Sequence, residues 1–343
     1  MNMLARSAVY EPNLFLPGPP TPPFLEPRVP SVRPAGPIGV ILNGKAHHHL
    51  RDGLPRVEVP ANVSRAAPTS RAELDRVLRG WAVRGMETLV VSGGDGTIRD
   101  VLTAAARHFP TMPRVALVPS GKTNALAMDL GVPRGWTLEQ AIRSASHGRV
   151  VTRAPIVIGR RDSGESPLHG FLLGAGAFVR ATTLAQDTHR LGAFNGLAVG
   201  LTLTGAVAQT LFGGRDNVWR RGDAMRIELA DGRVLDRSMY ILLASTLERL
   251  PLGVKPFGRV RAGLKLLGVD APPRALAATL PAVLAGAEAS WLAARGYRRA
   301  DTRQLRLNLQ SKFVLDGELY EGGDLTIDEG QPIEFLVPAE SCS

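Results

Sequence analysis

The stretch Val90–Asp100, VVSGGDGTIRD, holds residue types that could bind a nucleotide. An apolar β-branched run leads into a loop that consists of Gly93, Gly94, Asp95, Gly96 and Thr97. Glycines let a ligand approach the backbone closely, and loop amides at the start of a helix bind phosphate. An acid in such a loop repels phosphate unless it holds a metal or takes a proton. The loop therefore predicts a nucleotide with Mg²⁺, and Asp95 is the candidate metal ligand. A plain strand–turn–helix connection is the alternative.

Composition bounds the class of protein. The 343 residues are enough for two domains, and a hydrophobic content of 44% is ordinary for a globular chain. The single cysteine, Cys342, excludes a disulfide framework and suits a reducing cytosol. A net charge of +10 fits nucleic acid, anionic lipid or phosphate-bearing substrates. Because basic and aromatic residues are not interleaved and no recognition motif is present, we expect no nucleic-acid partner.

The N-terminal segment and the longest apolar run indicate where in the cell the protein is expected. Residues 1–37 are dense in proline and are expected to form an extended or disordered tail. No signal-peptide pattern is present at the N-terminus. The longest charge-free apolar run, Leu191–Phe212, is marginal for a membrane span and is interpreted as a buried helix. The expectation is a cytoplasmic protein that can also lie peripherally on the inner face of the membrane.

Alternating strand and helix patterns over residues 38–150 predict a doubly wound α/β domain. Strands are expected at Ile38–Asn43, Val57–Val59, Thr88–Val91 and Arg114–Val118, and helices at Ser70–Gly85, Ile98–His108 and Thr137–Gly148. Asn43, Gly44 and Lys45 follow the first strand, where Asn43 could hydrogen-bond a nucleotide and Lys45 could touch a phosphate.

A second glycine loop follows the strand Arg114–Val118 and contains Gly121, Lys122, Thr123 and Asn124. Ala116–Thr123 differs at one position from a P-loop, which requires glycine at 116, and Ala116 lies inside the predicted strand. A true P-loop is therefore disfavoured. Lys122 could neutralise nucleotide phosphate, and Asn124 could hydrogen-bond the nucleotide.

The alternation of strand and helix patterns gives way near Val150 to short strand-like runs, and residues 151–326 are interpreted as a β-rich domain. Short strands are expected at Val150–Ile158, His169–Leu173, Ala177–Val179, Arg226–Leu229, Val234–Leu235, Met239–Ser245, Leu264–Val269 and Leu305–Leu309, with a helical stretch at Ala181–Phe212. Asp231-Gly232 is a hairpin signal. Leu276–Arg295 is expected to be an amphipathic helix that either packs on its own domain or lies on a membrane. A closing strand is expected at Ile333–Val337, and residues 327–343 can pack back on the first domain.

Three motifs together resemble one superfamily. GGDGT at Gly93–Thr97 is similar to the nucleotide signature of the diacylglycerol kinase, sphingosine kinase and NAD kinase superfamily. Gly121–Asn124 with DLGVP at Asp129–Pro133 resembles the Gly-Thr-x-Asn segment of the lipid kinases, although Lys122 stands where they commonly have threonine. Asp316-Gly317-Glu318, between two strand-like segments, resembles their Asp-Gly-Glu turn.

The resemblance implies a nucleotide domain followed by a sandwich-type β-rich lipid-substrate domain. It implies ATP and Mg²⁺, with Asp316 as general base on a lipid hydroxyl and Glu318 assisting base or metal. If Asp95 is the base instead, the roles of Asp95 and Asp316 exchange. The implied partner is a lipid substrate at a membrane surface, and a homodimer stays open. Alternatives are an NAD kinase, which shares GGDGT, and a degenerate nucleotide-binding regulatory protein.

Overall fold

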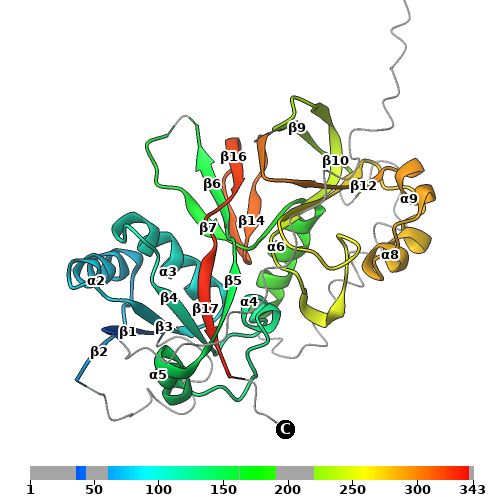
Figure 1. Cartoon of the computed structure of the whole chain (residues 1–343). Coiled ribbons are helices and arrows are strands. Elements are labelled where there is room, and N and C mark those ends of the chain that lie inside the picture. Colours follow the sequence, from blue (N-terminus) through cyan, green and yellow to red (C-terminus); the bar gives the residue numbers. More distant parts are fainter. Residues whose placement is uncertain (1–35, 44–60, 162, 191–219, 340–343) are drawn as a thin grey trace, which may run out of the picture.

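The computed structural model describes residues 36–43, 61–161, 163–190 and 220–339. Two lobes lie side by side in it (Figure 1), one built on a mostly parallel sheet and one on an antiparallel sheet. Their arrangement confirms the predicted fold class. Gly44, Lys45, the strand predicted at Val57–Val59 and the run Leu191–Phe212 lie outside the described residues.

The first lobe holds a six-stranded sheet in the order β2-β1-β3-β4-β17-β5. Its elements are β1 (Ile38–Leu42), β2 (Val63–Ala66), α2 (Arg71–Val83), β3 (Thr88–Gly93), α3 (Asp95–His108), β4 (Arg114–Pro119), α4 (Ala125–Asp129), α5 (Leu138–His147), β5 (Arg149–Arg153) and β17 (Ile333–Val337). Neighbouring strands are parallel except β17 and β5. Consequently the loops that follow β1, β3 and β4 meet at one edge of the sheet.

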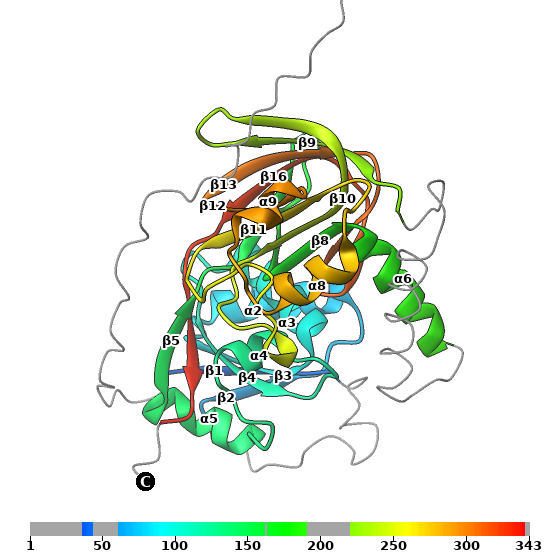
Figure 2. The same cartoon turned by 90° about the vertical axis from the view of Figure 1, so that its right-hand side faces the viewer.

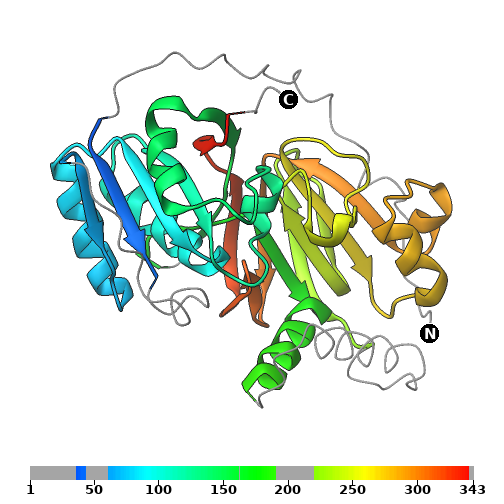
Figure 3. The ribbon, with the colours of Figure 1, turned by 90° about the horizontal axis from the view of Figure 1, so that it is seen from below.

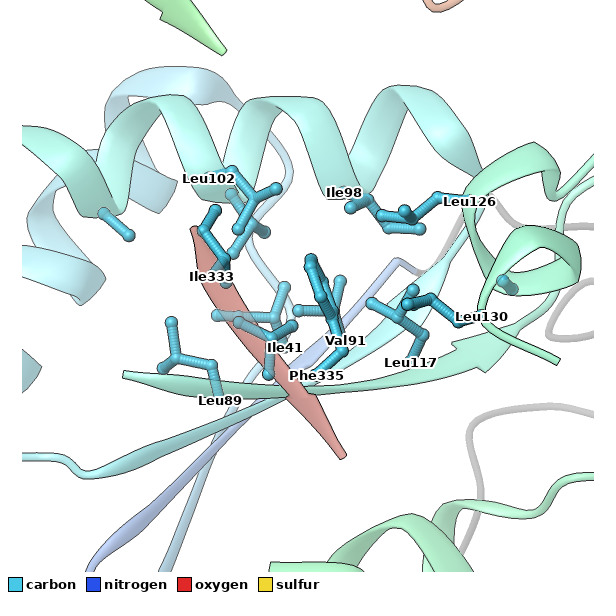
Figure 4. Close-up of a cluster of buried hydrophobic side chains, with 14 of the residues drawn as sticks. Ile41, Leu89, Val91, Ile98, Leu102, Leu117, Leu126, Leu130, Ile333 and Phe335 are labelled. Atoms are coloured by element: carbon cyan, nitrogen blue, oxygen red, sulfur yellow. The ribbon is translucent and has the colours of Figure 1, made fainter. Parts of the chain in front are cut away.

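Both faces of this sheet are buried, because successive strand residues alternate between two cores. In β3, Leu89 and Val91 face the core shared with α2, α3 and α4, whereas Val90 faces the core shared with α5. Figure 4 shows the first core, where Phe335 of β17 lies among side chains from β3, β4 and α3. Phe335 is fully buried, so β17 is an integral strand of the sheet.

The second lobe is an eleven-stranded antiparallel sheet that encloses a core of its own. Its elements are β6 (Ile156–Arg160), β7 (Leu168–Gly170), β8 (Leu172–Gly176), α6 (Ala177–Arg190), β9 (Asp223–Leu229), β10 (Val234–Ser245), the 3₁₀ turn η1 (Pro251–Gly253), β11 (Leu264–Asp270), α8 (Leu276–Leu284), α9 (Ser290–Ala294), β12 (Tyr297–Thr302), β13 (Gln304–Leu309), β14 (Phe313–Leu315), β15 (Glu318–Tyr320) and β16 (Gly323–Glu329). The first half of β10 pairs with β9 and its second half with β8 and β11, so the sheet divides there into two layers, seen in Figure 3.

Several expectations about elements were wrong. The separate strands expected at Val234–Leu235 and Met239–Ser245 are one strand, β10, and His169–Leu173 is divided between β7 and β8. The run Val150–Ile158 is not one strand, since β5 lies in the first sheet and β6 in the second. Ala177–Val179 opens helix α6, because Gly176 adopts a φ of +72° that ends β8, and the Phe178 ring then covers Gly174 one turn back. Leu276–Arg295 is two short helices, since Gly286, with a φ of +85°, stops the first of them.

The lobes are joined by side chains as well as by the backbone. Phe171, the residue between β7 and β8, lies in the core of the first lobe and meets the Phe335 ring edge-on at a centroid distance of 6.2 Å. The backbone N–H of His169 donates to the hydroxyl of Thr103 in α3 at 3.0 Å. These contacts fix the β14–β15 turn relative to the glycine loops.

Candidate active site

The first glycine loop is shorter than its sequence suggested. Helix α3 begins at Asp95, with Gly94 as its N-cap, so Gly96 and Thr97 already belong to the first helical turn. Thr97 therefore does not cap the helix. Instead its hydroxyl accepts a 2.7 Å hydrogen bond from the Asn43 side-chain amide, which ties the end of β1 to the loop. An acidic residue in the first turn is favourable to the helix dipole, which explains the early start.

The two glycine loops touch through their α-carbons. A Cβ atom added at Gly121 would lie 2.6 Å from the Gly94 Cα, and one added at Gly94 would lie 3.0 Å from the Gly121 Cα. No side chain can be placed at Gly121 without moving one of the two loops. The pair therefore keeps side chains away from the loop backbone at the edge of the sheet, which lets a phosphate approach the start of α3.

The second loop is held closed by its own asparagine. Asn124 adopts a left-handed φ of +52°, its Oδ1 accepts the Gly121 N–H at 3.0 Å, and its Nδ2 donates to the Gly121 carbonyl at 2.7 Å. Both ends of this amide shape the turn, whereas the sequence suggested a contact to the nucleotide. Lys122 and Thr123, at the tip of the turn, are exposed.

A cleft of about 500 Å³ opens beside these loops. The end of β1, the start of α2 and both glycine loops form its walls; among its lining residues are Asn43, Arg71, Gly94, Thr97, Gly121 and Lys122. Ser70 caps α2 by accepting the Glu73 N–H, which places Arg71 at the rim. The cleft is large enough for a nucleotide.

Three charged side chains on the cleft wall, Arg71, Arg99 and Asp100, form a bridge between the lobes together with Glu318. Arg71 and Arg99 both bind the carboxylate of Glu318, and both bind that of Asp100. The Arg71–Glu318 distance is 2.6 Å and the Arg99–Asp100 distance is 2.9 Å. Sequence reasoning assigned Glu318 to the base or the metal, whereas the structure places its carboxylate between two guanidinium groups.

Arg99 is the buried member of this bridge, with 2% of its side chain exposed. It also donates to the Leu315 carbonyl at 3.2 Å and lies over the Tyr320 ring at 5.7 Å. It therefore holds both strands of the β14–β15 hairpin. Sequence reasoning missed it, because an arginine in a helix is normally solvent-exposed; the one available signal was its place four residues after Asp95.

Asp316 begins the turn of that hairpin with a left-handed φ of +46°. Its carboxylate accepts the backbone N–H groups of Phe171 and Leu172 at 2.9–3.1 Å. Burial raises the pKa of Asp316 to about 7; the two amide hydrogen bonds oppose this shift, and the charge of Asp95 adds to it. An acid with this pKa can accept a proton near neutral pH.

Asp95 faces the same place from the first lobe. Burial raises its pKa, against the opposing effect of backbone N–H groups at the start of α4, including that of Leu126. Asp95 and Asp316 together line a void of about 10 Å³, the size of a single water molecule, between the lobes. The structure thus brings together the two carboxylates that sequence reasoning named as alternative bases.

A magnesium site made by protein alone is not found in the described part of the chain, where no group of three or more His, Cys, Asp and Glu side chains converges. Mg²⁺ bound to a nucleotide needs only one or two carboxylates, since phosphates and water supply its other ligands. The Asp95 carboxylate is turned toward the amides of α4, and Asp100, on the cleft wall, is paired with arginines. Because both carboxylates are engaged, Mg²⁺ would depend on nucleotide phosphates and water for most of its ligands.

Comparison with known proteins agrees with this geometry. Residues 38–155 match the diacylglycerol kinase catalytic domain. Over this segment the chain is similar to the diacylglycerol kinase catalytic-domain family. A solved diacylglycerol kinase structure from Bacillus anthracis superposes with a TM-score of 0.60 at 15% identity, covering 88% of this chain and 96% of that one, which shows the same two-lobe fold.

The names of several curated relatives are those of lipid kinases. A protein named "Probable lipid kinase YegS-like" from Xanthomonas campestris is 30% identical over 211 residues, which is 57% of this chain and 64% of the relative. One of the same name from Pseudomonas aeruginosa is 28% identical over 267 residues, covering 76% and 74%. A diacylglycerol kinase from Bacillus subtilis is 31% identical over 94 residues, or 27% and 31%. The aligned region spans just under two thirds of the Xanthomonas relative.

Among the described residues, no helix is both long and apolar enough to cross a membrane.

Proposed function

We propose that this chain is an ATP-dependent lipid kinase, which transfers the γ-phosphoryl group of ATP to the hydroxyl of diacylglycerol or a related lipid. One observation carries the proposal: the Gly94–Gly121 contact keeps side chains off the loop backbone at the cleft, where α3 begins, while Asp95 and Asp316 meet at a void beside the same loop. A phosphoryl-transfer site requires both a phosphate cradle and a base for the acceptor hydroxyl.

The cleft supplies the donor side of the reaction. Gly94, Gly96 and Gly121 would present the phosphate-binding backbone, and Thr97, held by Asn43, would fix the loop. Lys122 has no acidic partner in the described part of the chain, so its charge is available to phosphate. When bound, ATP and Mg²⁺ supply the transferable group and neutralise its charge.

Asp316 would act as general base on the acceptor. It would take the proton of the lipid hydroxyl as the hydroxyl oxygen forms its bond to the γ-phosphorus and the bond to the β-phosphate oxygen breaks, leaving ADP. A pKa of about 7 keeps a large fraction of Asp316 ionised at neutral pH. Asp95 is the second candidate, since it lines the same void and its pKa is also raised.

The test is transfer of labelled phosphate from Mg²⁺–ATP to diacylglycerol, sphingosine and phosphatidylglycerol in mixed micelles, with NAD alongside. Labelled lipid is the expected product. Labelled NADP would assign the chain to NAD kinase, and bound ATP without any product would favour a regulatory protein.

Substitution then assigns the base. Asp316→Asn is expected to remove transfer and to leave the ATP affinity within about threefold, because a base acts in the transition state. Asp231→Asn is the matched control, since Asp231 starts the Asp-Gly turn of the exposed β9–β10 hairpin. If Asp316→Asn transfers phosphate at the wild-type rate while Asp95→Asn does not, Asp95 is the base.

A further inference from the structure

The loop between β10 and β11, residues 246–263, carries an unusual exposed leucine. Leu252 is 95% exposed, although most large apolar side chains in the described residues are buried. It also adopts a left-handed φ of +61°, a conformation unfavourable to a residue with a branched apolar side chain. Both features are unfavourable in water, so the free protein gains nothing from a leucine at this position.

The backbone of the loop is anchored on both sides of Leu252. The Arg249 N–H donates to the carboxylate of Asp129, the last residue of α4, at 2.6 Å. The Lys255 N–H donates to the carbonyl of Leu284, the last residue of α8, at 2.7 Å. Figure 2 shows the yellow turn η1 between α4 and α8. Leu252 is therefore presented on a supported turn.

Other exposed apolar side chains gather on the same segment and on the helices that follow it. Of the seven large apolar side chains exposed in the described residues, four lie between residues 252 and 291: Leu252, Val260, Leu284 and Trp291. Leu284 adjoins the loop through its bond to Lys255. More than half of the exposed large apolar side chains in the described residues thus lie in one stretch of the chain.

From Arg249 onward the charged side chains of the loop are all basic, whereas Glu248 pairs with Arg153 and the Glu288 carboxylate accepts the Arg259 backbone N–H at 2.9 Å. No acidic residue occurs from Arg249 to Val269. Arg249, Lys255 and Arg259 are exposed, and none of the three side chains has an acidic partner among the described residues. Such a surface is complementary to a bilayer that contains anionic lipid. The apolar side chains can be buried among the lipids, and the cations can bind the lipid phosphates.

The loop also leads to the candidate active site. Leu247, five residues before Leu252, lines the void that holds Asp95 and Asp316. The loop that carries Leu252 thus starts at the void that holds the two candidate bases.

We propose that the β10–β11 loop docks the protein on an anionic phospholipid bilayer, with Leu252 inserted among the lipids and Arg249, Lys255 and Arg259 on their phosphates. The proposal rests on the proposed function, because it takes a membrane lipid as the substrate.

Vesicle sedimentation of the full chain tests the proposal without any catalytic step. The vesicles contain phosphatidylcholine with or without phosphatidylglycerol, and neither diacylglycerol nor ATP. The wild type is expected to bind the phosphatidylglycerol vesicles, and Leu252→Asn is expected to bind them at least tenfold more weakly, since burial of a leucine side chain changes partition by one to two orders of magnitude. Asparagine tolerates the left-handed backbone, so the variant is expected to fold.

Val83→Asn is the matched control, because Val83 is 86% exposed at the end of α2, away from this loop, and binding within twofold of wild type is expected. Lys255→Gln with Arg259→Gln is expected to weaken binding to the anionic vesicles about tenfold or more, at roughly fivefold for each cation. Equal binding of wild type and Leu252→Asn, equal binding to the two kinds of vesicle, or no binding of the wild type would each overturn the proposal. A chain that binds vesicles but phosphorylates no lipid would refute only the proposed function.

Discussion

Replacement of Arg99 by glutamine is expected to destabilise the protein far more than the same replacement of Arg71. Both guanidinium groups bind the carboxylates of Asp100 and Glu318, so the two variants lose the same partners. They differ in exposure, which is 2% for the side chain of Arg99 and 60% for that of Arg71. The comparison therefore isolates the effect of burial on one kind of ion pair.

The magnitudes follow from that difference. Removing one member of a fully buried pair costs about 3–5 kcal/mol, because a charge is left without a partner. Here Asp100 and Glu318 are 26% and 39% exposed and keep Arg71, so we expect a loss of about 3 kcal/mol in the free energy of unfolding for Arg99→Gln. For Arg71→Gln we expect about 1 kcal/mol or less, as is typical of exposed pairs.

Urea unfolding measures both losses, provided that the slope of free energy against urea is unchanged. A double variant completes the cycle, and coupling between the two arginines is expected because they share both carboxylates. Equal losses in the two single variants, or a larger loss for Arg71→Gln, would refute the view that the β14–β15 hairpin is held from the buried side.

Four further results are expected. Gly121→Ala should weaken ATP binding at least tenfold, because its Cβ would lie 2.6 Å from the Gly94 Cα. Gly135→Ala is the control and should bind ATP as the wild type does, since an added Cβ there meets no atom within 4 Å. Calorimetry of ATP binding compares the two variants. The transfer rate should rise as pH increases through about 7, the pKa of Asp316. Between about pH 4 and pH 7, Asp316 keeps a proton in the folded protein that it releases in the unfolded chain. The free energy of unfolding should therefore fall as pH rises through this range, by up to about 4 kcal/mol. Urea unfolding at several pH values measures this slope, which Asp316→Asn should lack. Gly80→Ala, exposed in α2 with no atom near the added methyl group, should raise the free energy of unfolding by about 1 kcal/mol, and an unchanged or lower midpoint in urea would contradict the helix-propensity argument.

The parts of the fold that depend on local patterns could be predicted from the sequence. Strands β1, β3 and β4 are uninterrupted apolar runs, and each is followed by a glycine or asparagine loop. Strand β2, Val63–Ala66, gave no such signal, because an edge strand with an arginine and a serine has no continuous apolar run. Ala177–Val179 resembled a strand by composition, and only the left-handed Gly176 decides that a helix begins there.

The site could be predicted only where its residues belong to short motifs. Gly94, Asp95 and Asp316 stand in such motifs, and the structure brings them to neighbouring loops. The partners of Glu318 could not be found in this way, since Arg99 lies 219 residues earlier and Arg71 lies 247 residues earlier. Contacts of this range depend on how two lobes meet, which no local pattern encodes.

The place of β17 has a consequence for the order in which the chain can fold. Phe335 pairs with Val115 on one side and with Val151 on the other, so β17 separates two strands made much earlier. A ribosome that has delivered the first 160 residues has therefore delivered a sheet with a gap between β4 and β5. The apolar edges of that gap, and the core that Phe335 fills, stay open until the whole second lobe has been synthesised. Folding of the first lobe is thus coupled to completion of the second, and the two lobes are expected to unfold in one cooperative transition.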